Sequence, residues 1–223
     1  ISEGIATIVL KRLADAQADG DRIYAVIKAV ASSSDGKGLS MTAPSSSGQK
    51  RAFNRAYAKA GFSPQTMRLY EAHGTGTVAG DRTELETISS LLREHQVSRP
   101  SCVLGSVKTI IGHTKSAAGV MGLIKVALSL YHKVLPPHRN VENPLNPLTA
   151  EDSPLYLLKE PSPWLAHPDY PRRAGVSAFG FGGTNFHAVL EEDLGQVKDT
   201  ALGANTWSHE LFVWRASTPE ALT

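Results

Sequence analysis

Cysteine is nearly absent from this chain of 223 residues, whose one thiol belongs to Cys102. A single cysteine excludes an intramolecular disulfide framework and a cysteine-rich zinc site. Long apolar runs are missing, because no stretch approaches the roughly 18 consecutive apolar residues of a membrane span. An excess of either charge is missing too, since 23 Lys and Arg stand against 21 Asp and Glu. This near balance argues against a nucleic-acid binder, which usually needs a clustered basic face.

An initiating methionine and a signal-peptide pattern are absent as well, since the chain begins at Ile1. We therefore expect an excised piece of a longer, cytoplasmic protein that contacts neither nucleic acid nor membrane. The length and the ordinary globular composition suit one large domain or two small ones.

Strand-like and helix-like segments alternate along the chain, and this alternation predicts an α/β layered fold with a largely buried sheet. Short β-branched or apolar runs predict strands at Ile5–Leu10, Arg22–Ala31, Leu69–Ala72, Val103–Val107, Leu155–Leu158, Ala174–Phe179 and Asn185–Glu191. Apolar residues at helical spacing predict helices at Gln49–Ala60, Asp81–Leu92 and Ala117–His132.

Local signals refine the three predicted helices. Gly61 stands at the C-cap position of the first. Asp81 and Glu84 have the spacing of an N-cap and its capping-box partner, so we expect the second to begin at Asp81. The third is long and largely apolar, and we predict that it is buried. Its Gly119 and Gly122 lower helix propensity, which favours close packing against a neighbouring element.

The apolar pattern fades after Glu192. We therefore place one domain at residues 1–192 and assign residues 193–223 to a linker. From residue 210 the chain begins a new strand-and-helix pattern that it does not finish.

Three glycine-rich segments join predicted strands to loops, at residues 71–77, 105–119 and 179–185. The first places His73 at the rim of a sheet, beside Thr hydroxyls that can bond an amide-bearing substrate arm. The second places His113 ahead of a helix N-terminus. The partial positive charge there disfavours imidazolium and suits a neutral His that donates to an oxyanion. The third can present backbone N–H groups while a Phe covers or opens a cavity.

Each segment also has a plainer interpretation. A His at a strand end is more often a hydrogen-bonded structural residue, and a glycine-rich loop is more often a tight turn. Two His without a third good ligand are weak grounds for zinc. The combination of two such His with a third glycine-rich loop favours a catalytic site. His187 lies in a predicted strand and is expected to be structural. We expect the remaining His at the surface: His95, His132, His138, His167 and His209.

In this order, the motifs HGTGT (73–77), VKTIIGHTKSAAG (107–119) and GFGGTN (180–185) resemble the C-terminal half of a β-ketoacyl synthase. The likeness is to the ketosynthase of a type I polyketide or polyunsaturated fatty acid synthase, and it covers residues 1–192. The tail resembles the linker that leads toward an acyltransferase domain. The resemblance implies the C-terminal half of a thiolase-like fold, an α-β-α layering of a mixed sheet with helices on both faces.

The resemblance also implies the reaction, a decarboxylative Claisen condensation of an acyl thioester with malonyl carrier protein. His73 and His113 would promote decarboxylation and stabilise the thioester enolate. Lys108 would hold the local charge network with Glu84, and the backbone N–H of Phe181 would form part of the oxyanion hole. Thr75 and Thr77 would hold the pantetheine arm, and the Phe179 ring would gate the pocket with Phe181. The implied substrate-binding residues are Thr75, Thr77, Phe179, Gly182 and Gly183, and the implied supporting residues are Asp81, Glu84 and Asn185.

The family's nucleophilic Cys has no counterpart here, because its small-residue elbow would lie upstream of every motif. Cys102 enters a predicted core strand, so we expect a small buried hydrophobe. The implied partners are therefore the N-terminal ketosynthase half, an acyl carrier protein, a downstream acyltransferase domain and a second copy in a homodimer. The substrate would travel on the carrier's 4'-phosphopantetheine, with no cofactor or metal bound directly. The face toward the missing half is expected to be apolar, which predicts poor solubility of the isolated chain.

Two alternatives stay open. The chain could be a non-catalytic docking or structural half-domain of a multidomain synthase, although the intact histidines and GFGGTN motif argue against loss of chemistry. A zinc-binding module is the third hypothesis, and it predicts stoichiometric metal in the purified protein.

Overall fold

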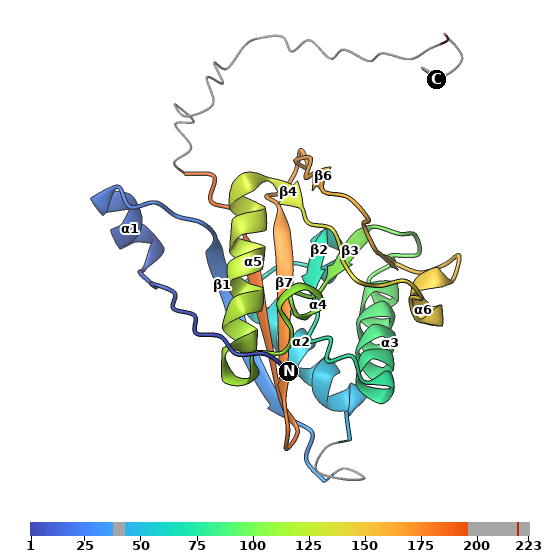
Figure 1. Cartoon of the computed structure of the whole chain (residues 1–223). Helices are drawn as coiled ribbons and strands as arrows, with labels where there is room; N and C mark the ends of the chain where they lie inside the picture. Colours follow the sequence, from blue (N-terminus) through green and yellow to red (C-terminus); the bar gives the residue numbers. More distant parts are fainter. Residues whose placement is uncertain (38–42, 196–217, 219–223) are drawn as a thin grey trace. The chain divides into compact units, whose positions relative to one another are not determined.

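A computed structural model describes residues 1–37, 43–195 and 218 (Figure 1). Residues 1–193 form one compact unit. The predicted linker at 193–223 lies almost wholly outside the described residues and stays a prediction.

A mixed six-stranded sheet forms the centre of the unit, in the order β1-β8-β7-β2-β3-β5. The first three strands pair antiparallel, whereas β7, β2, β3 and β5 run parallel to one another. The strands are β1 (Val26–Ser34), β2 (Leu69–Glu71), β3 (Cys102–Gly105), β5 (Leu155–Tyr156), β7 (Arg173–Gly180) and β8 (Thr184–Glu191).

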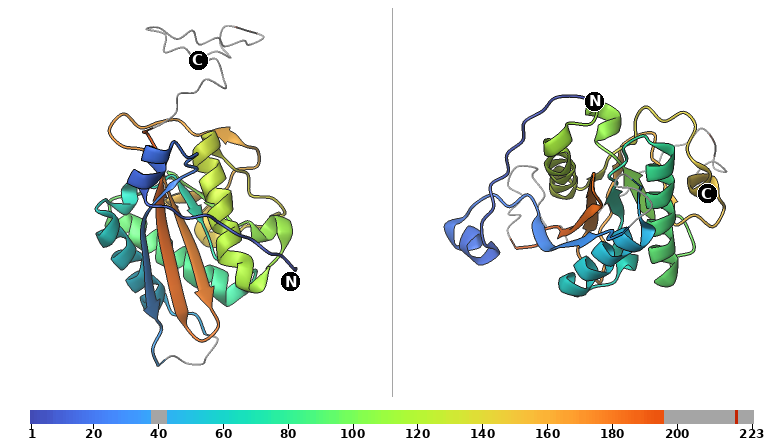
Figure 2. Two further views of the ribbon diagram at one scale, coloured as in Figure 1. Left: turned by 90° about the vertical axis from the view of Figure 1, so that its left-hand side faces the viewer. Right: turned by 90° about the horizontal axis from the view of Figure 1, so that it is seen from below.

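Helices cover both faces of this sheet, as the two views in Figure 2 show. On one face α2 (Ser46–Ala60) and α3 (Val78–Glu94) bury a core that includes Phe53, Ile88 and Tyr70. On the other face α5 (Ala118–His132) buries a second core that includes Val126 and Leu69. Leu69 and Tyr70 are neighbours in β2 yet belong to opposite cores, because successive strand side chains point to opposite faces. The predicted α/β layering is therefore confirmed.

The short elements were not predicted. They are α1 (Leu13–Asp19), α4 (Lys108–Ile111), α6 (Asn146–Thr149), the 3₁₀ turns η1 (Pro64–Thr66) and η2 (Lys115–Ala117), and a small antiparallel pair of β4 (Val134–Leu135) with β6 (Ser162–Pro163). A helix of one or two turns shows too few apolar repeats for periodicity to reveal it.

The predicted strand at Ile5–Leu10 is wrong. Residues 1–12, all of them described, form neither helix nor strand, and Ile5 and Val9 are 95% and 94% exposed. The β-branched run has the propensity of a strand, but a strand also needs a sheet edge and a surface to pack on. The next predicted strand was placed early, because β1 begins at Val26 and continues through the polar Ser32–Ser34.

Two predicted helix properties also differ from the structure. The second predicted helix begins at Val78 rather than Asp81, with Thr77 as its N-cap. The third is not buried all round, since Leu128 and Tyr131 of α5 are exposed. Gly119 and Gly122 do face the sheet as expected: a Cβ on Gly119 would lie 3.2 Å from Cβ of Ala178.

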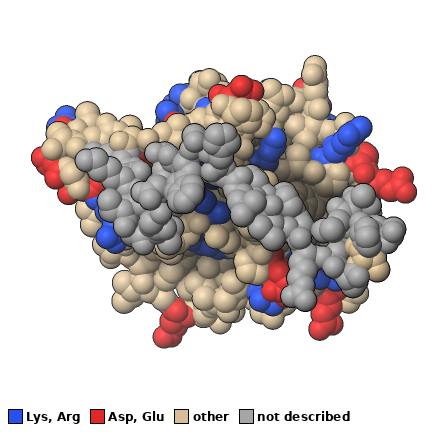
Figure 3. All heavy atoms as spheres, turned by 90° about the horizontal axis from the view of Figure 1, so that it is seen from above, with Lys and Arg blue, Asp and Glu red and all other residues tan. Residues whose placement is uncertain are grey.

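The surface of the described part is apolar in places and mixed in charge. Ile1, Ile5, Val9 and Leu10 of the N-terminal segment are exposed, as are Val30 and Phe186 on the sheet. Acidic and basic groups are interspersed on the face drawn in Figure 3. In the described ranges, no helix combines the length and the apolar character that a bilayer crossing requires.

Candidate active site

The glycine-rich segments meet at one end of the sheet, where the parallel strands β2 and β3 both terminate. His73 follows β2, Lys108 and His113 follow β3, and Phe179 lies near the end of β7. The ring centroids of His73 and His113 are 5.7 Å apart with an interplanar angle of 89°, and those of His73 and Phe179 are 5.5 Å apart. The fold thus brings together four residues that were predicted from three separate motifs.

His73 is held in its neutral form. Burial lowers its pKa from the ordinary 6.5 to about 3, and the nearby Lys108 and His113 act in the same direction. Its Nδ1 is buried and has no hydrogen-bond partner within residues 1–37 and 43–195. The imidazole therefore stays uncharged near neutral pH, with one ring nitrogen unused by the described chain.

His113 is also neutral, and its tautomer follows from one contact. Its Nδ1 accepts a hydrogen bond from the backbone N–H of Lys115 at 3.0 Å, so the proton lies on Nε2. Partial burial lowers its pKa, as do Lys108 and Lys115. The sequence predicted a neutral imidazole on the strength of the helix N-terminus, whereas burial and two lysines are the causes found. A neutral Nε2–H is a suitable donor to a developing oxyanion.

Lys108 supplies positive charge to both histidines from the first turn of α4. Burial lowers the pKa of its own ammonium, while the carboxylates of Glu71, Glu84 and Asp81 oppose that effect. Within the described ranges, Lys108 forms no ion pair at close contact. It is a desolvated cation balanced by carboxylates at longer range.

Glu84 does not act in a capping box, because α3 has already begun at Val78. Its carboxylate reaches back instead, accepting hydrogen bonds from the backbone N–H groups of His73 at 2.9 Å and Gly74 at 3.0 Å. Burial raises the pKa of Glu84 to about 7, although these two hydrogen bonds work in the opposite direction. Asp81 of the same helix accepts from the backbone N–H of Gly76 at 3.2 Å. Two acidic side chains of α3 therefore hold the loop that carries His73.

The two threonines of the HGTGT motif lie on the exposed side of that loop. The hydroxyl oxygens of Thr75 and Thr77 are 3.0 Å apart and bond to each other. Both hydroxyls are at the surface, where an approaching ligand can exchange this bond for its own.

The GFGGTN motif forms the turn between β7 and β8, with Gly182 and Gly183 at positive φ of 93° and 78°. Phe181 is 85% exposed at the tip. Asn185 is buried below it and donates to the carboxylate of Asp35 at 2.6 Å, while the backbone N–H of Asp35 donates to the Gly183 carbonyl at 2.7 Å. Asp35, which the sequence did not single out, thus ties β1 to this turn.

A buried polar chain leads from the site into the core. Tyr70 donates to Glu84 at 3.4 Å and lies 2.6 Å from the Ser177 hydroxyl, which is 3.0 Å from Nδ1 of His187. Nε2 of His187 lies 3.3 Å from the hydroxyl of Tyr57 on α2. One proton order satisfies every member, from Tyr57 through a neutral His187 to the Glu84 carboxylate. His187 is thus the structural residue that was predicted, and burial lowers its pKa to about 3.

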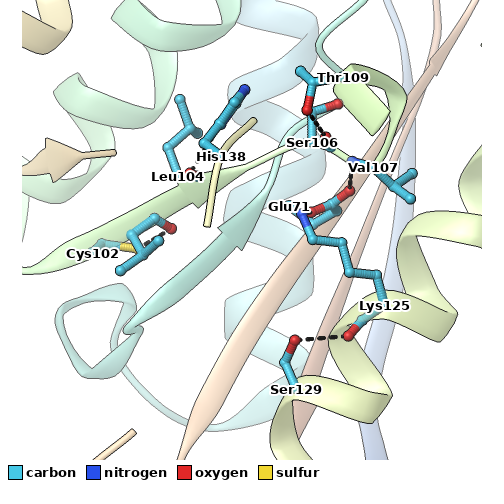
Figure 4. Close-up of polar contacts among 10 residues, drawn as sticks. Glu71, Cys102, Leu104, Ser106, Val107, Thr109, Lys125, Ser129 and His138 are labelled. Carbon is cyan, nitrogen blue, oxygen red and sulfur yellow. Dashed lines mark hydrogen bonds and ion pairs between the residues drawn. The ribbon is translucent and has the colours of Figure 1, made fainter. Parts of the chain in front are cut away.

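The structure also describes His138, Cys102 and the side chains that could ligate a metal ion. His138 was expected at the surface but is half-buried, with Nδ1 donating to the Leu104 carbonyl at 3.2 Å (Figure 4). Cys102 is buried in β3, and burial raises its pKa to about 12, which keeps the thiol protonated. Among the described residues, no three His, Cys, Asp or Glu side chains gather as a metal ion requires.

Comparison with known proteins gives a consistent result. Residues 24–142 match the family model described as "Beta-ketoacyl synthase, C-terminal domain". The chain is 48% identical over 197 residues to a polyunsaturated fatty acid synthase polypeptide of Thraustochytrium, covering 86% of this chain and 7% of that protein. It is 45% identical to the polyketide synthase PksL of Bacillus subtilis, covering 85% of this chain and 4% of that protein. The chain is therefore a small fraction of these relatives in length.

Solved structures give the fold. A ketosynthase from module 6 of the bacillaene synthase of Bacillus subtilis superimposes with a TM-score of 0.78 at 44% identity, covering 82% of this chain and 33% of that one. A PfaC keto synthase–chain length factor superimposes with a TM-score of 0.75 at 38% identity, covering 83% of this chain and 19% of that one. This likeness confirms the predicted thiolase-like α/β fold.

Proposed function

Because the chain belongs to the β-ketoacyl synthase family, we propose that it supplies the histidine-bearing half of a condensing active site. The observation that carries the proposal is the pair of neutral imidazoles, His73 and His113, with ring centroids 5.7 Å apart beside a buried lysine. Two neutral donors at this separation can share one developing negative charge without repelling each other as imidazolium ions would.

The reaction proposed is decarboxylative condensation. The bond between the α-carbon and the carboxylate of a malonyl thioester breaks, CO₂ leaves, and the electron pair moves into an enolate whose charge lies on the thioester oxygen. His113 Nε2–H donates to that oxygen together with His73. The enolate carbon then attacks an acyl thioester, a carbon–carbon bond forms, and the thiolate leaves. Stabilisation of the enolate lowers the barrier of the first step.

The acyl thioester would be held by a Cys on the N-terminal half, because the buried Cys102 with its raised pKa is unsuited to attack. The exposed apolar residues of segment 1–12 and of β1 are the surface that we assign to that half. Malonyl and acyl groups would arrive on the 4'-phosphopantetheine of an acyl carrier protein, with the arm bonded by Thr75 and Thr77. An acyltransferase domain downstream, a homodimer and a cytoplasmic setting complete the proposal.

The test uses the full-length synthase that contains this chain. Replacing His113 with Ala is expected to slow release of CO₂ from malonyl carrier protein by about 10² or more, as for loss of one oxyanion donor. Unchanged decarboxylation and condensation would support the docking alternative instead. A stable acyl adduct on Cys102 of the isolated chain would also contradict the proposal.

A further inference from the structure

Glu71 and Lys125 form a buried ion pair below the candidate active site (Figure 4). Lys125 Nζ lies 2.7 Å from Glu71 Oε2, and the two side chains are 12% and 1% exposed. Glu71 is the last residue of β2, two positions before His73, and Lys125 lies in the middle of α5. The pair therefore joins the end of the sheet that bears the site to α5, the helix that covers one face of the sheet.

The second carboxylate oxygen of Glu71 holds a third element. Oε1 accepts a hydrogen bond from the backbone N–H of Val107 at 2.5 Å, directly before Lys108. The hydroxyl of Thr109 donates to the carbonyl of Ser106 at 2.9 Å and closes the same turn (Figure 4). One carboxylate thus fixes the start of the segment that carries both Lys108 and His113.

Two glycines provide the space for the pair. A Cβ on Gly122 of α5 would lie 3.1 Å from Cγ of Glu71. A Cβ on Gly105 of β3 would lie 2.7 Å from Nζ of Lys125 and 3.1 Å from Oε2 of Glu71. Any larger residue at either position would press on the ion pair. Both α5 and β3 therefore place a glycine against the ion pair.

We propose that Glu71, whose charge Lys125 compensates, is a positioning residue of the active site, which sets the 106–113 segment relative to His73. The inference rests on the proposed function for its catalytic consequence, but not for its structural one. Glu71 acts by accepting the Val107 N–H, and Lys125 compensates the charge of this buried carboxylate. Neither side chain is assigned a contact with substrate.

The chain contains a matched control at the other end of the sheet. Glu192 accepts from the backbone N–H of Arg172 at 2.8 Å through Oε1, and from the guanidinium of the same residue at 2.6 Å through Oε2. Its burial is similar, with side-chain exposures of 12% for Arg172 and 8% for Glu192. Changes at Glu192 therefore report the general effect of losing a buried carboxylate that accepts two hydrogen bonds.

The experiment compares two double variants in the full-length synthase. Glu71→Gln with Lys125→Met removes both charges and keeps an acceptor for the Val107 N–H, whereas Glu71→Leu with Lys125→Met removes the acceptor too. Hydrogen exchange of peptides covering residues 106–113 and steady-state decarboxylation of malonyl carrier protein are measured on each. We expect the Gln variant to stay within about threefold of wild type in both. The Leu variant should exchange roughly tenfold faster and lose about tenfold in kcat, with KM within about twofold.

Each outcome bears on the inference. Unchanged exchange in the Leu variant, or an equal rise of exchange at residues 106–113 in Glu192→Leu, overturns it. Equal losses in the Gln and Leu variants also overturn it, because they assign the effect to charge alone. If the wild-type synthase released no CO₂ while exchange in the Leu variant still rose, the proposed function would fail and the positioning of the segment would stand.

Discussion

The Glu84 carboxylate fixes the backbone of His73 by accepting its N–H at 2.9 Å. The helix that bears Glu84 begins one residue after the HGTGT motif, so the motif and its own support are continuous in the chain. Removal of this carboxylate should therefore act on the His73 loop first and on the rest of α3 second.

We predict that Glu84→Ala destabilises the complete ketosynthase domain by about 3 kcal/mol, because it leaves the buried N–H groups of His73 and Gly74 without an acceptor. Glu84→Gln retains one acceptor oxygen and should cost less. Urea unfolding measures both, and Glu86→Gln on the exposed side of the same helix is the control. A loss no larger than that of the control would show that the two hydrogen bonds contribute little.

His187 should make the stability of the domain depend on pH in acid. Its pKa is about 3 when folded and near 6.5 when unfolded, so the unfolded chain binds the extra proton first as the pH falls. The contribution of His187 to stability is fully present above pH 6.5 and is lost as the pH falls toward 3, at up to about 1.4 kcal/mol per pH unit. The variant His187→Gln should flatten that slope in urea titrations between pH 6 and pH 4.

The exposed His132 of α5 provides the control, since His132→Gln should leave the same slope in place. Glu84 adds a dependence of opposite sign. Its pKa is raised to about 7 by burial, so its protonated form favours the folded state, and that contribution is lost as the pH rises from about 4.5 to 7. His73, whose pKa is also about 3, contributes in the same direction as His187, so a slope that is unchanged in His187→Gln would contradict only the contribution assigned to His187.

Much of the fold was accessible from local sequence signals. The helix predicted at 49–60 begins three residues earlier, at Ser46, but its body and its end at Gly61, with φ of 77°, follow from apolar spacing and from a residue type that tolerates a left-handed conformation. Strands β2, β7 and β8 were predicted within one residue of their bounds, because buried runs of apolar residues contrast with polar neighbours. These elements bury their side chains within the described chain, so their own sequence holds the information.

The errors have a common physical origin in partners that are distant in sequence. Residues 5–10 read as a strand, but nothing in the described chain pairs with them. Asp81 and Glu84 match a capping box in spacing, yet Glu84 bonds to residues ten and eleven positions earlier. Glu71 begins the first glycine-rich segment, whereas Lys125 and Asp35 lie in no motif. The role of all three could not be predicted locally, because each matters only through a contact that the fold creates.

The charge of Lys108 should set the acid limb of the reaction's pH profile. Its ammonium lowers the pKa of both His73 and His113, which keeps the imidazoles neutral to lower pH. The variant Lys108→Met should raise both pKa values, so decarboxylation should begin to fall at a higher pH than in wild type. The charges that face Lys108 from other elements are Glu71, Glu84, Asp81 and Lys125, and all of them remain in this variant.

Lys115→Met separates the two histidines, because Lys115 lowers the pKa of His113 and is not among the causes that act on His73. In Lys115→Met the fall of the decarboxylation rate in acid should also move to higher pH, by less than in Lys108→Met. The measurement is the rate of CO₂ release from malonyl carrier protein between pH 4 and pH 8 in the full-length synthase. An acid limb that does not move in Lys108→Met would contradict this electrostatic account.

The turn of the GFGGTN motif offers a comparison between two adjacent glycines that share a positive φ but differ in their neighbours. A Cβ on Gly183 would lie 2.9 Å from Cβ of Asp35, whereas a Cβ on Gly182 would have nothing within 4 Å. Both alanine variants incur a left-handed backbone cost of about 1–2 kcal/mol. Gly183→Ala should lose a further 1–3 kcal/mol, roughly, because it also displaces Asp35 from Asn185. Urea unfolding of the two variants in the complete domain measures the difference, and equal losses would mean that Asp35 moves aside without consequence for the turn.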